Sequence, residues 1–119
     1  MGENEKNLLE DSDLKTVMEL SLNEYLDDLS KELPKEPSLD EPFFDVNVKP
    51  ADKSIFFSRR FNPTDKISAI KTFSKIKLRT YADIKLCGAY NNKIYVKDNE
   101  TLEEANIKDK DTFIIQEKK

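Results

Sequence analysis

Apolar residues near the N-terminus follow the spacing of an α-helix. From Asp13 to Leu29 no glycine or proline interrupts the chain, and small or apolar side chains recur every three or four residues. The stripe consists of Leu14, Val17, Met18, Ser21, Leu22 and Tyr25. This spacing places side chains along one helical face, and the acids and serine at 11–13 suit a helix start. We therefore predict a helix over residues 11–30, preceded by a polar segment, residues 1–10, that we expect to be disordered.

The next segment, residues 31–42, has a different composition. It contains Pro34, Pro37 and Pro42 among charged residues. Proline cannot continue a helix, and the segment offers few apolar side chains for burial. We expect a proline-rich linker between an isolated N-terminal helix and the remainder of the chain.

Beyond residue 42 the pattern changes to the alternation typical of strands. Val46 and Val48 alternate with polar residues, as in a strand with one buried face. The predicted order over residues 43–119 is a strand around Val46, a turn at 49–54, a strand at 55–61, a helix at 66–76, strands at 82–89 and 93–97, a helical turn at 101–105 and a closing strand at 111–116. A hairpin, one helix and a late strand in this order describe an α+β domain with the β-grasp, or ubiquitin-like, fold.

Charge divides the chain where the hydrophobic pattern changes. The net charge is −4, but residues 1–44 hold 13 acids and 4 bases, a net of −9. Residues 45–119 hold 11 acids and 16 bases, a net of +5. Hydrophobic and charged residues each make up 37%, so the whole chain is too polar to share one core. These charges indicate an acidic appendage in front of a mildly basic domain.

Several kinds of chemistry lack the residues that they need. The chain has no histidine and one cysteine, Cys87, which excludes histidine acid–base catalysis, a thiolate zinc site and an intrachain disulfide. Gly2 and Gly88 are the only glycines, so a glycine-rich phosphate loop is excluded. Cys87 lies in an apolar stretch, where a buried structural thiol is expected. We expect no catalysis, no cofactor and no metal. With no apolar run near the roughly 20 residues of a membrane span, we expect a cytoplasmic and/or nuclear protein.

Two stretches of the predicted domain resemble one family in particular. Arg59-Arg60-Phe61-Asn62, followed by Lys66-Ile67-Ser68-Ala69-Ile70, is similar to the second strand and helix start of UBX domains. Thr101-Leu102-Glu103-Glu104-Ala105, after an acidic turn, looks like a later segment of the same family. The resemblance implies binding to the N-terminal domain of the valosin-containing AAA ATPase.

The residues that make this contact in UBX domains correspond only in part. The family uses an arginine on the first strand and a Phe-Pro-Arg turn between the third and fourth strands. The resemblance places these positions on Lys49 and on Tyr90, Asn91 and Asn92. Lysine keeps the charge without arginine's planar fork, and Tyr90 keeps an aromatic anchor. Asn91 lacks the rigidity of proline, and Asn92 removes a cation. The alternative interpretation of 90–92 is a plain polar turn.

The predicted N-terminal helix resembles a ubiquitin-interacting motif. That motif has leading acids, a leucine, a small residue, a serine, and then an apolar residue and an acid. The implied ubiquitin-binding positions are Leu14, Val17, Met18, Ser21, Leu22 and Glu24, with Val17 in place of the usual alanine. Such a helix lays an apolar stripe on a shallow hydrophobic patch, with acids at its basic rim. The alternative is an ordinary amphipathic helix that folds back on the domain or dimerises.

Other partners remain open at this point. A basic strand, Ser58-Arg59-Arg60, could engage a small GTPase, which requires Arg59 and Arg60 to be exposed at a sheet edge. An ATPase partner instead requires Lys49 and Tyr90 together at one end of the sheet. The opposed charges also suggest that the acidic helix docks on the chain's own domain as a regulatory element. A nucleic-acid site is not expected, because no stacking aromatics are interleaved with the basic residues.

The sequence therefore predicts a monomeric, non-enzymatic ubiquitin-pathway adaptor. Its helix would bind ubiquitin or a ubiquitin-like modifier, and its UBX-like domain would bind the N-domain of the AAA ATPase. The alternative is a β-grasp interaction module for a small GTPase or another protein, with the acidic helix docked on it.

Overall fold

The structure is a computed structural model, and it describes residues 20–118. A helix, whose described part covers residues 20–32, precedes the domain. The elements of the domain are β1 (Phe44–Pro50), β2 (Phe57–Phe61), α2 (Ile67–Leu78), β3 (Ile84–Gly88), β4 (Ile94–Tyr95) and β5 (Thr112–Glu117).

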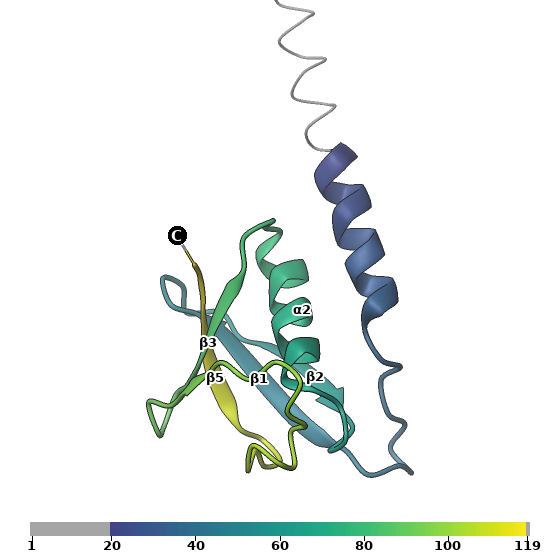
Figure 1. Cartoon of the computed structure of the whole chain (residues 1–119), viewed down its shortest axis with the longest axis vertical. Coiled ribbons are helices and arrows are strands. Elements are labelled where there is room, and N and C mark those ends of the chain that lie inside the picture. The colour runs from purple at the N-terminus through teal and green to yellow at the C-terminus, as the bar shows by residue number, and fades with distance from the viewer. Residues whose placement is uncertain (1–19, 119) are drawn as a thin grey trace, which may run out of the picture.

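The five strands form one mixed sheet in the order β2-β1-β5-β3-β4. Strands β1 and β5 are parallel, with Val48 opposite Phe113, and the other neighbours are antiparallel. Helix α2 crosses one face of this sheet (Figure 1). This arrangement is the β-grasp fold, which confirms the fold predicted from the order of elements.

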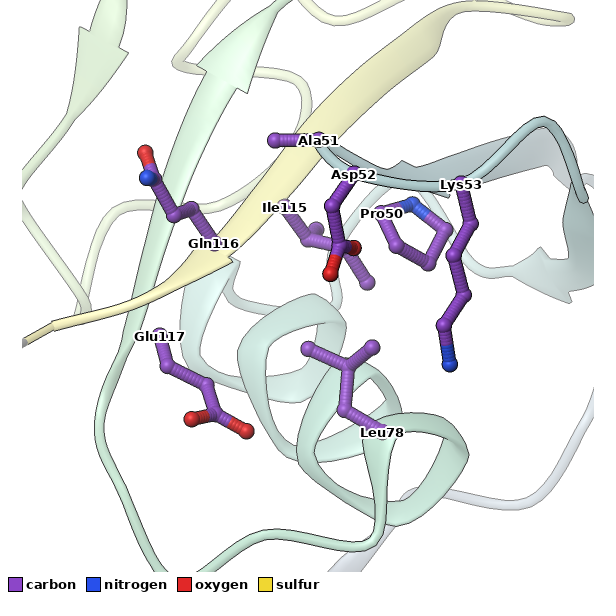
Figure 2. A pocket seen from close by; sticks show the side chains of 8 residues that line it. All are labelled: Pro50, Ala51, Asp52, Lys53, Leu78, Ile115, Gln116 and Glu117. Atoms are coloured by element: carbon purple, nitrogen blue, oxygen red, sulfur yellow. The ribbon is translucent and has the colours of Figure 1, made fainter.

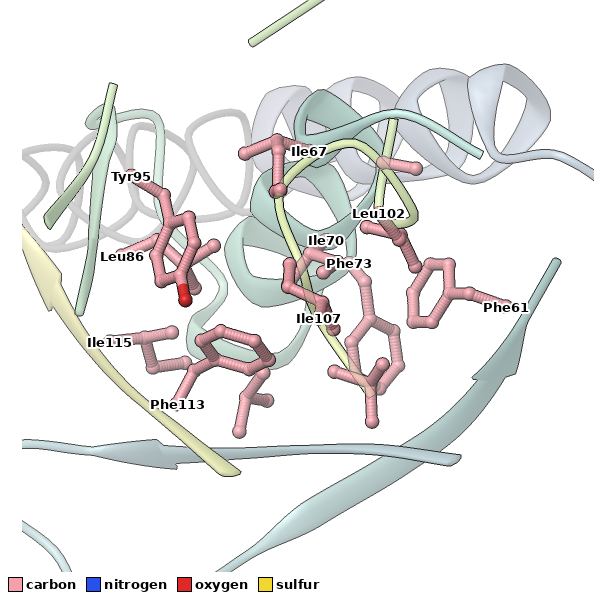
Figure 3. Packing of buried hydrophobic residues seen from close by; sticks show 14 of the residues in the cluster. Phe61, Ile67, Ile70, Phe73, Leu86, Tyr95, Leu102, Ile107, Phe113 and Ile115 are labelled. Atoms are coloured by element: carbon pink, nitrogen blue, oxygen red, sulfur yellow. The ribbon is translucent and has the colours of Figure 1, made fainter. Parts of the chain in front are cut away.

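The core lies between α2 and the sheet (Figure 3). Alternate residues of each strand face it, so Val46 and Val48 are fully buried on β1, as are Leu86 on β3 and Ile115 on β5. Aromatic rings fill the space between the layers in edge-to-face pairs: Phe61 with Phe73 at 5.9 Å, and Tyr95 with Phe113 at 5.4 Å between ring centroids. The remaining members of the core are Ile67, Ala69, Ile70, Ile84, Leu102, Ala105 and Ile107.

Strand β2 begins later than the alternation of the sequence predicts. Ile55 and Phe56 precede the strand and are 50% and 56% exposed. The ladder between β1 and β2 ends at the pair Val48–Phe57. Beyond this pair the chain turns, with the Lys53 N–H donating to the Pro50 carbonyl at 3.2 Å. Because this turn carries the chain away from β1, the two apolar residues are left on the surface.

The described part of the N-terminal helix packs against the domain beside α2 (Figure 1). Leu26 and Leu29 are only 6% and 9% exposed. The ring of Tyr25 lies 4.7 Å from that of Tyr81, in the loop after α2, and the Lys75 ammonium lies 5.2 Å from the Tyr25 ring. The helix is thus held by apolar burial, an aromatic pair and a cation–π contact.

The segment between the helix and β1, assigned to a linker above, runs along strand β2. The Pro34 carbonyl accepts a hydrogen bond from the Arg59 guanidinium. The Glu36 carboxylate accepts the Arg60 backbone N–H at 3.0 Å and lies 3.8 Å from its guanidinium. Pro37 is buried. We call residues 33–43 the strap, because they connect the helix to the sheet and cover part of the outer edge of β2.

A short turn at 101–106 closes the core through a capping box. The Glu104 N–H donates to the Thr101 hydroxyl at 3.1 Å, and the Thr101 N–H donates to the Glu104 carboxylate at 3.1 Å. The two bonds hold the turn so that Leu102 and Ala105 point into the core. The hydrogen bond from the Thr101 backbone, together with that of its side chain, lowers the pKa of Glu104 from its ordinary value of 4.5.

We expect this capping box to weaken in acid. Because the folded pKa of Glu104 is lowered, its stabilisation is present above the ordinary pKa and is lost as the pH falls through the folded value. Glu104→Gln removes this charge while keeping an acceptor oxygen. The thermal unfolding temperatures of the two proteins should differ at about pH 7 and converge once the pH falls below the folded pKa of Glu104. A difference that stays constant over this range would contradict the assignment.

Candidate interaction surfaces

The turn between β3 and β4 presents one aromatic side chain to solvent. Tyr90 is 83% exposed, the largest exposure among the large hydrophobic residues of the described chain. The turn lies at the Thr112 end of β5, since Gly88 is opposite Phe113 and the Ala89 N–H donates to the Thr112 carbonyl at 3.0 Å. Tyr90 is therefore available as an anchor at one end of the sheet.

The side chain of Asn91 supports this turn from inside. Its carboxamide oxygen accepts the Lys93 N–H at 3.0 Å, and its nitrogen donates to the Tyr95 hydroxyl at 3.3 Å. A Cβ atom on Gly88 would lie 2.0 Å from that oxygen, so the carboxamide occupies space that only glycine leaves free. Asn92 has a φ of 56°, in the left-handed region that asparagine tolerates. Side-chain hydrogen bonds thus supply rigidity where a Phe-Pro-Arg turn would use proline.

Lys49 lies on the outer face of the sheet, two residues farther from the turn than Asn47. It is opposite Ile114, whereas Asn47 is opposite Thr112, whose carbonyl binds the start of the turn. The Lys49 ammonium donates to the Pro50 carbonyl at 3.2 Å. Asn47, which the resemblance to UBX domains does not indicate, therefore lies nearer to the turn than Lys49 does.

The predicted ubiquitin-binding residues fall partly within the described helix. Leu14, Val17 and Met18 lie outside the described residues. Ser21 and Glu24 are exposed, whereas Leu22 is half-buried, on the side where the helix packs on the domain. In the described part of the helix, Ser21 and Glu24 are thus accessible to a partner, whereas Leu22 is partly covered by the domain.

Arg59 and Arg60 are already engaged at the sheet edge. Besides its bond to the strap, the Arg59 guanidinium lies 4.6 Å from the Phe61 ring centroid, and burial lowers the pKa of this guanidinium from its ordinary value. The Arg60 guanidinium lies 5.7 Å from the Phe43 ring, in addition to its pairing with Glu36. The two arginines are half-buried and bind the strap. Their side chains are therefore less exposed than the GTPase alternative requires.

The described residues offer few groups for catalysis or metal binding. Cys87 is half-buried on the outer face of β3, opposite Ile114, and so lies outside the core where a structural thiol was expected. Among residues 20–118, no three histidine, cysteine, aspartate or glutamate side chains are grouped to hold a metal ion. No helix in this range is long and apolar enough to cross a membrane.

Comparison with known proteins gives structural likeness only. No protein-family model matches the chain. No curated protein matches it either. A ubiquitin from Caldiarchaeum subterraneum superposes with a TM-score of 0.56 at 19% identity, covering 65% of this chain and 95% of that one. A UBX domain superposes with a TM-score of 0.61 at 18% identity, covering 73% of this chain and 81% of that domain's chain. The C-terminal ubiquitin-like domain of mouse tubulin-specific chaperone E superposes at 0.54 and 6% identity, covering 71% and 96%. The chain therefore has a ubiquitin-like fold.

Proposed function

We propose that the chain is a non-enzymatic adaptor of the ubiquitin pathway. Its N-terminal helix binds ubiquitin or a ubiquitin-like modifier, and its domain binds the N-domain of the valosin-containing AAA ATPase. The observation that carries the proposal is the β3–β4 turn, a rigid turn at one end of a UBX-like fold with its aromatic side chain exposed. The resemblance of the sequence to UBX domains and the UBX domain among the similar structures support the same conclusion.

The proposed ATPase contact is anchored by Tyr90. A rigid turn loses little conformational entropy on binding, and a buried tyrosine is a common source of binding energy in interfaces. Asn91 contributes by holding the turn, since its side chain is bonded to Lys93 and Tyr95. Asn92 and Lys49 flank the contact, and Asn47 joins them because its position is nearer to the turn.

We expect Tyr90→Ala to weaken binding of the ATPase N-domain by about tenfold or more, because an anchoring tyrosine contributes on the order of 2 kcal/mol. Stability should not change, since the side chain is 83% exposed. Isothermal titration calorimetry of the wild-type chain, Tyr90→Ala and the exposed-site control Leu39→Ala would measure this. Wild-type binding that Tyr90→Ala leaves unchanged would remove Tyr90 from the contact, and no wild-type binding would refute this half of the function.

The proposed ubiquitin contact uses the outward side of the N-terminal helix. Ser21 and Glu24 are exposed there, where a hydroxyl and a carboxylate can meet a polar and basic rim. An NMR titration of the labelled chain with ubiquitin should shift the resonances of residues 14–24 and leave those of β5 in place. Ser21→Arg should abolish the shifts, with Ser30→Arg, on an exposed site of the same helix, as the control. Shifts spread evenly over the domain, or none, would contradict the proposal.

A second function is favoured by the packing of the same helix. Leu22 and Tyr25, part of the apolar stripe, are half-buried against the domain, and Tyr25 stacks on Tyr81. A partner that needs this part of the stripe must displace the contact, so the helix acts as a self-docking regulatory element of a β-grasp interaction module. Tyr81→Ala should then tighten ubiquitin binding, whereas equal affinity would show that docking and binding are independent.

A further inference from the structure

The end of the domain opposite the β3–β4 turn contains a hollow of about 400 Å³ (Figure 2). It is lined by Pro50, Ala51, Asp52, Lys53, Leu78, Ile115, Gln116 and Glu117. Its floor is apolar, because Pro50 and Ile115 are buried and Leu78, at the end of α2, is half-buried. The hollow lies between the β1–β2 turn, the end of β5 and the last turn of α2, all elements of the folded domain.

Two carboxylates stand over this apolar floor. The side chains of Asp52 and Glu117 both project from the rim over the hollow, on the side of Leu78 (Figure 2). Their backbones are fixed, since the Ala51 N–H donates to the Ile115 carbonyl at 3.0 Å and Glu117 is paired with Ile84. Within residues 20–118 neither carboxylate forms an ion pair, and Lys53 is the one cation of the lining.

The loop that forms one wall also carries the exposed pair Ile55 and Phe56. They follow Lys53 by two and three residues, which places them within about 10 Å of it along the chain. Ile55 and Phe56 are 50% and 56% exposed, and exposed apolar patches are a common mark of an interaction site. One short peptide could therefore contact the hollow and this pair together.

We propose that this end of the domain is a docking surface for an extended peptide of a partner protein, with an arginine two residues after a bulky apolar residue. The aliphatic stem of the arginine lies on Leu78, Pro50 and Ile115, and its guanidinium fork is held between Asp52 and Glu117. The apolar residue, which lies on the same side of the extended peptide as the arginine, packs on Ile55 and Phe56. Charge selects the occupant, because an acidic side chain would be repelled by both carboxylates.

This surface shares no residue with the ATPase and ubiquitin contacts proposed above. The hollow lies at the Glu117 end of β5, and the β3–β4 turn lies at its Thr112 end, as the pairing of β3 with β5 shows. A peptide in the hollow therefore leaves Tyr90 free, so the domain could hold two partners at once.

An NMR titration of the full labelled chain with acetyl-Phe-Gly-Arg-amide tests the proposal. We expect shifts of the amides of Asp52, Lys53 and Glu117, and an affinity at least about fivefold weaker for the same peptide with neutral citrulline in place of arginine. Asp52→Asn combined with Glu117→Gln should remove this preference for arginine. Glu103→Gln, an exposed acid elsewhere on the domain, should preserve it.

A second variant tests the apolar half of the surface. Phe56→Ser should weaken the binding of acetyl-Phe-Gly-Arg-amide. It should leave unchanged the binding of the same peptide with glycine in place of phenylalanine. The proposal is overturned if arginine and citrulline peptides bind equally, if the shifts lie outside this end of the domain, or if the double variant keeps its preference for arginine. The absence of any shift at several millimolar peptide would overturn it as well.

Discussion

Replacing Leu26 and Leu29 together with aspartate should detach the N-terminal helix and lower the free energy of unfolding by about 3 kcal/mol. Each leucine is nearly buried against the domain, and burial of a leucine contributes about 1.5–3 kcal/mol. The expected loss of free energy is smaller than the sum for two leucines, because the detached helix is solvated while the sheet and α2 stay in place. Urea unfolding would measure the loss, and hydrogen exchange would show residues 20–32 losing protection while β5 keeps it.

Exposed positions on the same part of the chain provide the control. Leu20 and Leu39 are 55% and 75% exposed, so Leu20→Asp with Leu39→Asp introduces the same charges without removing buried surface. This pair should unfold like the wild-type chain. If both double variants lowered the free energy of unfolding equally, the added charge and not the lost burial would be the cause. If neither changed it, the helix would contribute nothing to the fold.

Replacing Gly88 with alanine should lower the free energy of unfolding by about 1–3 kcal/mol and disorder the β3–β4 turn. The new methyl group would lie 2.0 Å from the Asn91 carboxamide oxygen. The carboxamide must then rotate away, which breaks its bonds to the Lys93 N–H and the Tyr95 hydroxyl, each contributing about 0.5–1.5 kcal/mol. Urea unfolding gives the stability, and the Lys93 amide resonance reports on the turn.

A double-mutant cycle separates this cause from a general effect of the methyl group. Asn91→Ala removes the same two hydrogen bonds and also the atom that the methyl group meets. Gly88→Ala should therefore cost much less on the Asn91→Ala background than on the wild-type chain. Additive costs would mean that the strain at Gly88 lies in the backbone and not in the contact with Asn91.

The fold followed from the sequence because local pattern and tertiary contact agree in the domain. The alternation at Val46 and Val48 and the helical spacing at Ile67, Ile70 and Phe73 mark faces that the structure buries. The pattern misplaced the start of β2, since Ile55 and Phe56 have high strand propensity while the turn after Pro50 ends their pairing. Propensity does not record where a neighbouring strand stops.

The candidate sites were less predictable for a related reason. Periodicity identified the apolar stripe of the N-terminal helix, but not that Tyr81 and Lys75 would pack on part of it. The turn at Tyr90 was selected by resemblance, whereas the role of Asn91 depends on its distance from Gly88 and Tyr95 in the folded chain. Such contacts join residues through the geometry of a turn, which a linear pattern does not contain.

The strap across β2 limits how partners can recognise the sheet. With Glu36 bonded to the Arg60 N–H, part of the β2 backbone is already occupied, and the opposite edge, β4, is two residues long. A partner peptide therefore finds little backbone to pair with as an added strand, the mode in which main-chain hydrogen bonds give affinity for many sequences alike. Recognition by residues 44–117 therefore depends on side chains. A single substitution in a partner peptide would then be enough to gain or lose binding to this domain.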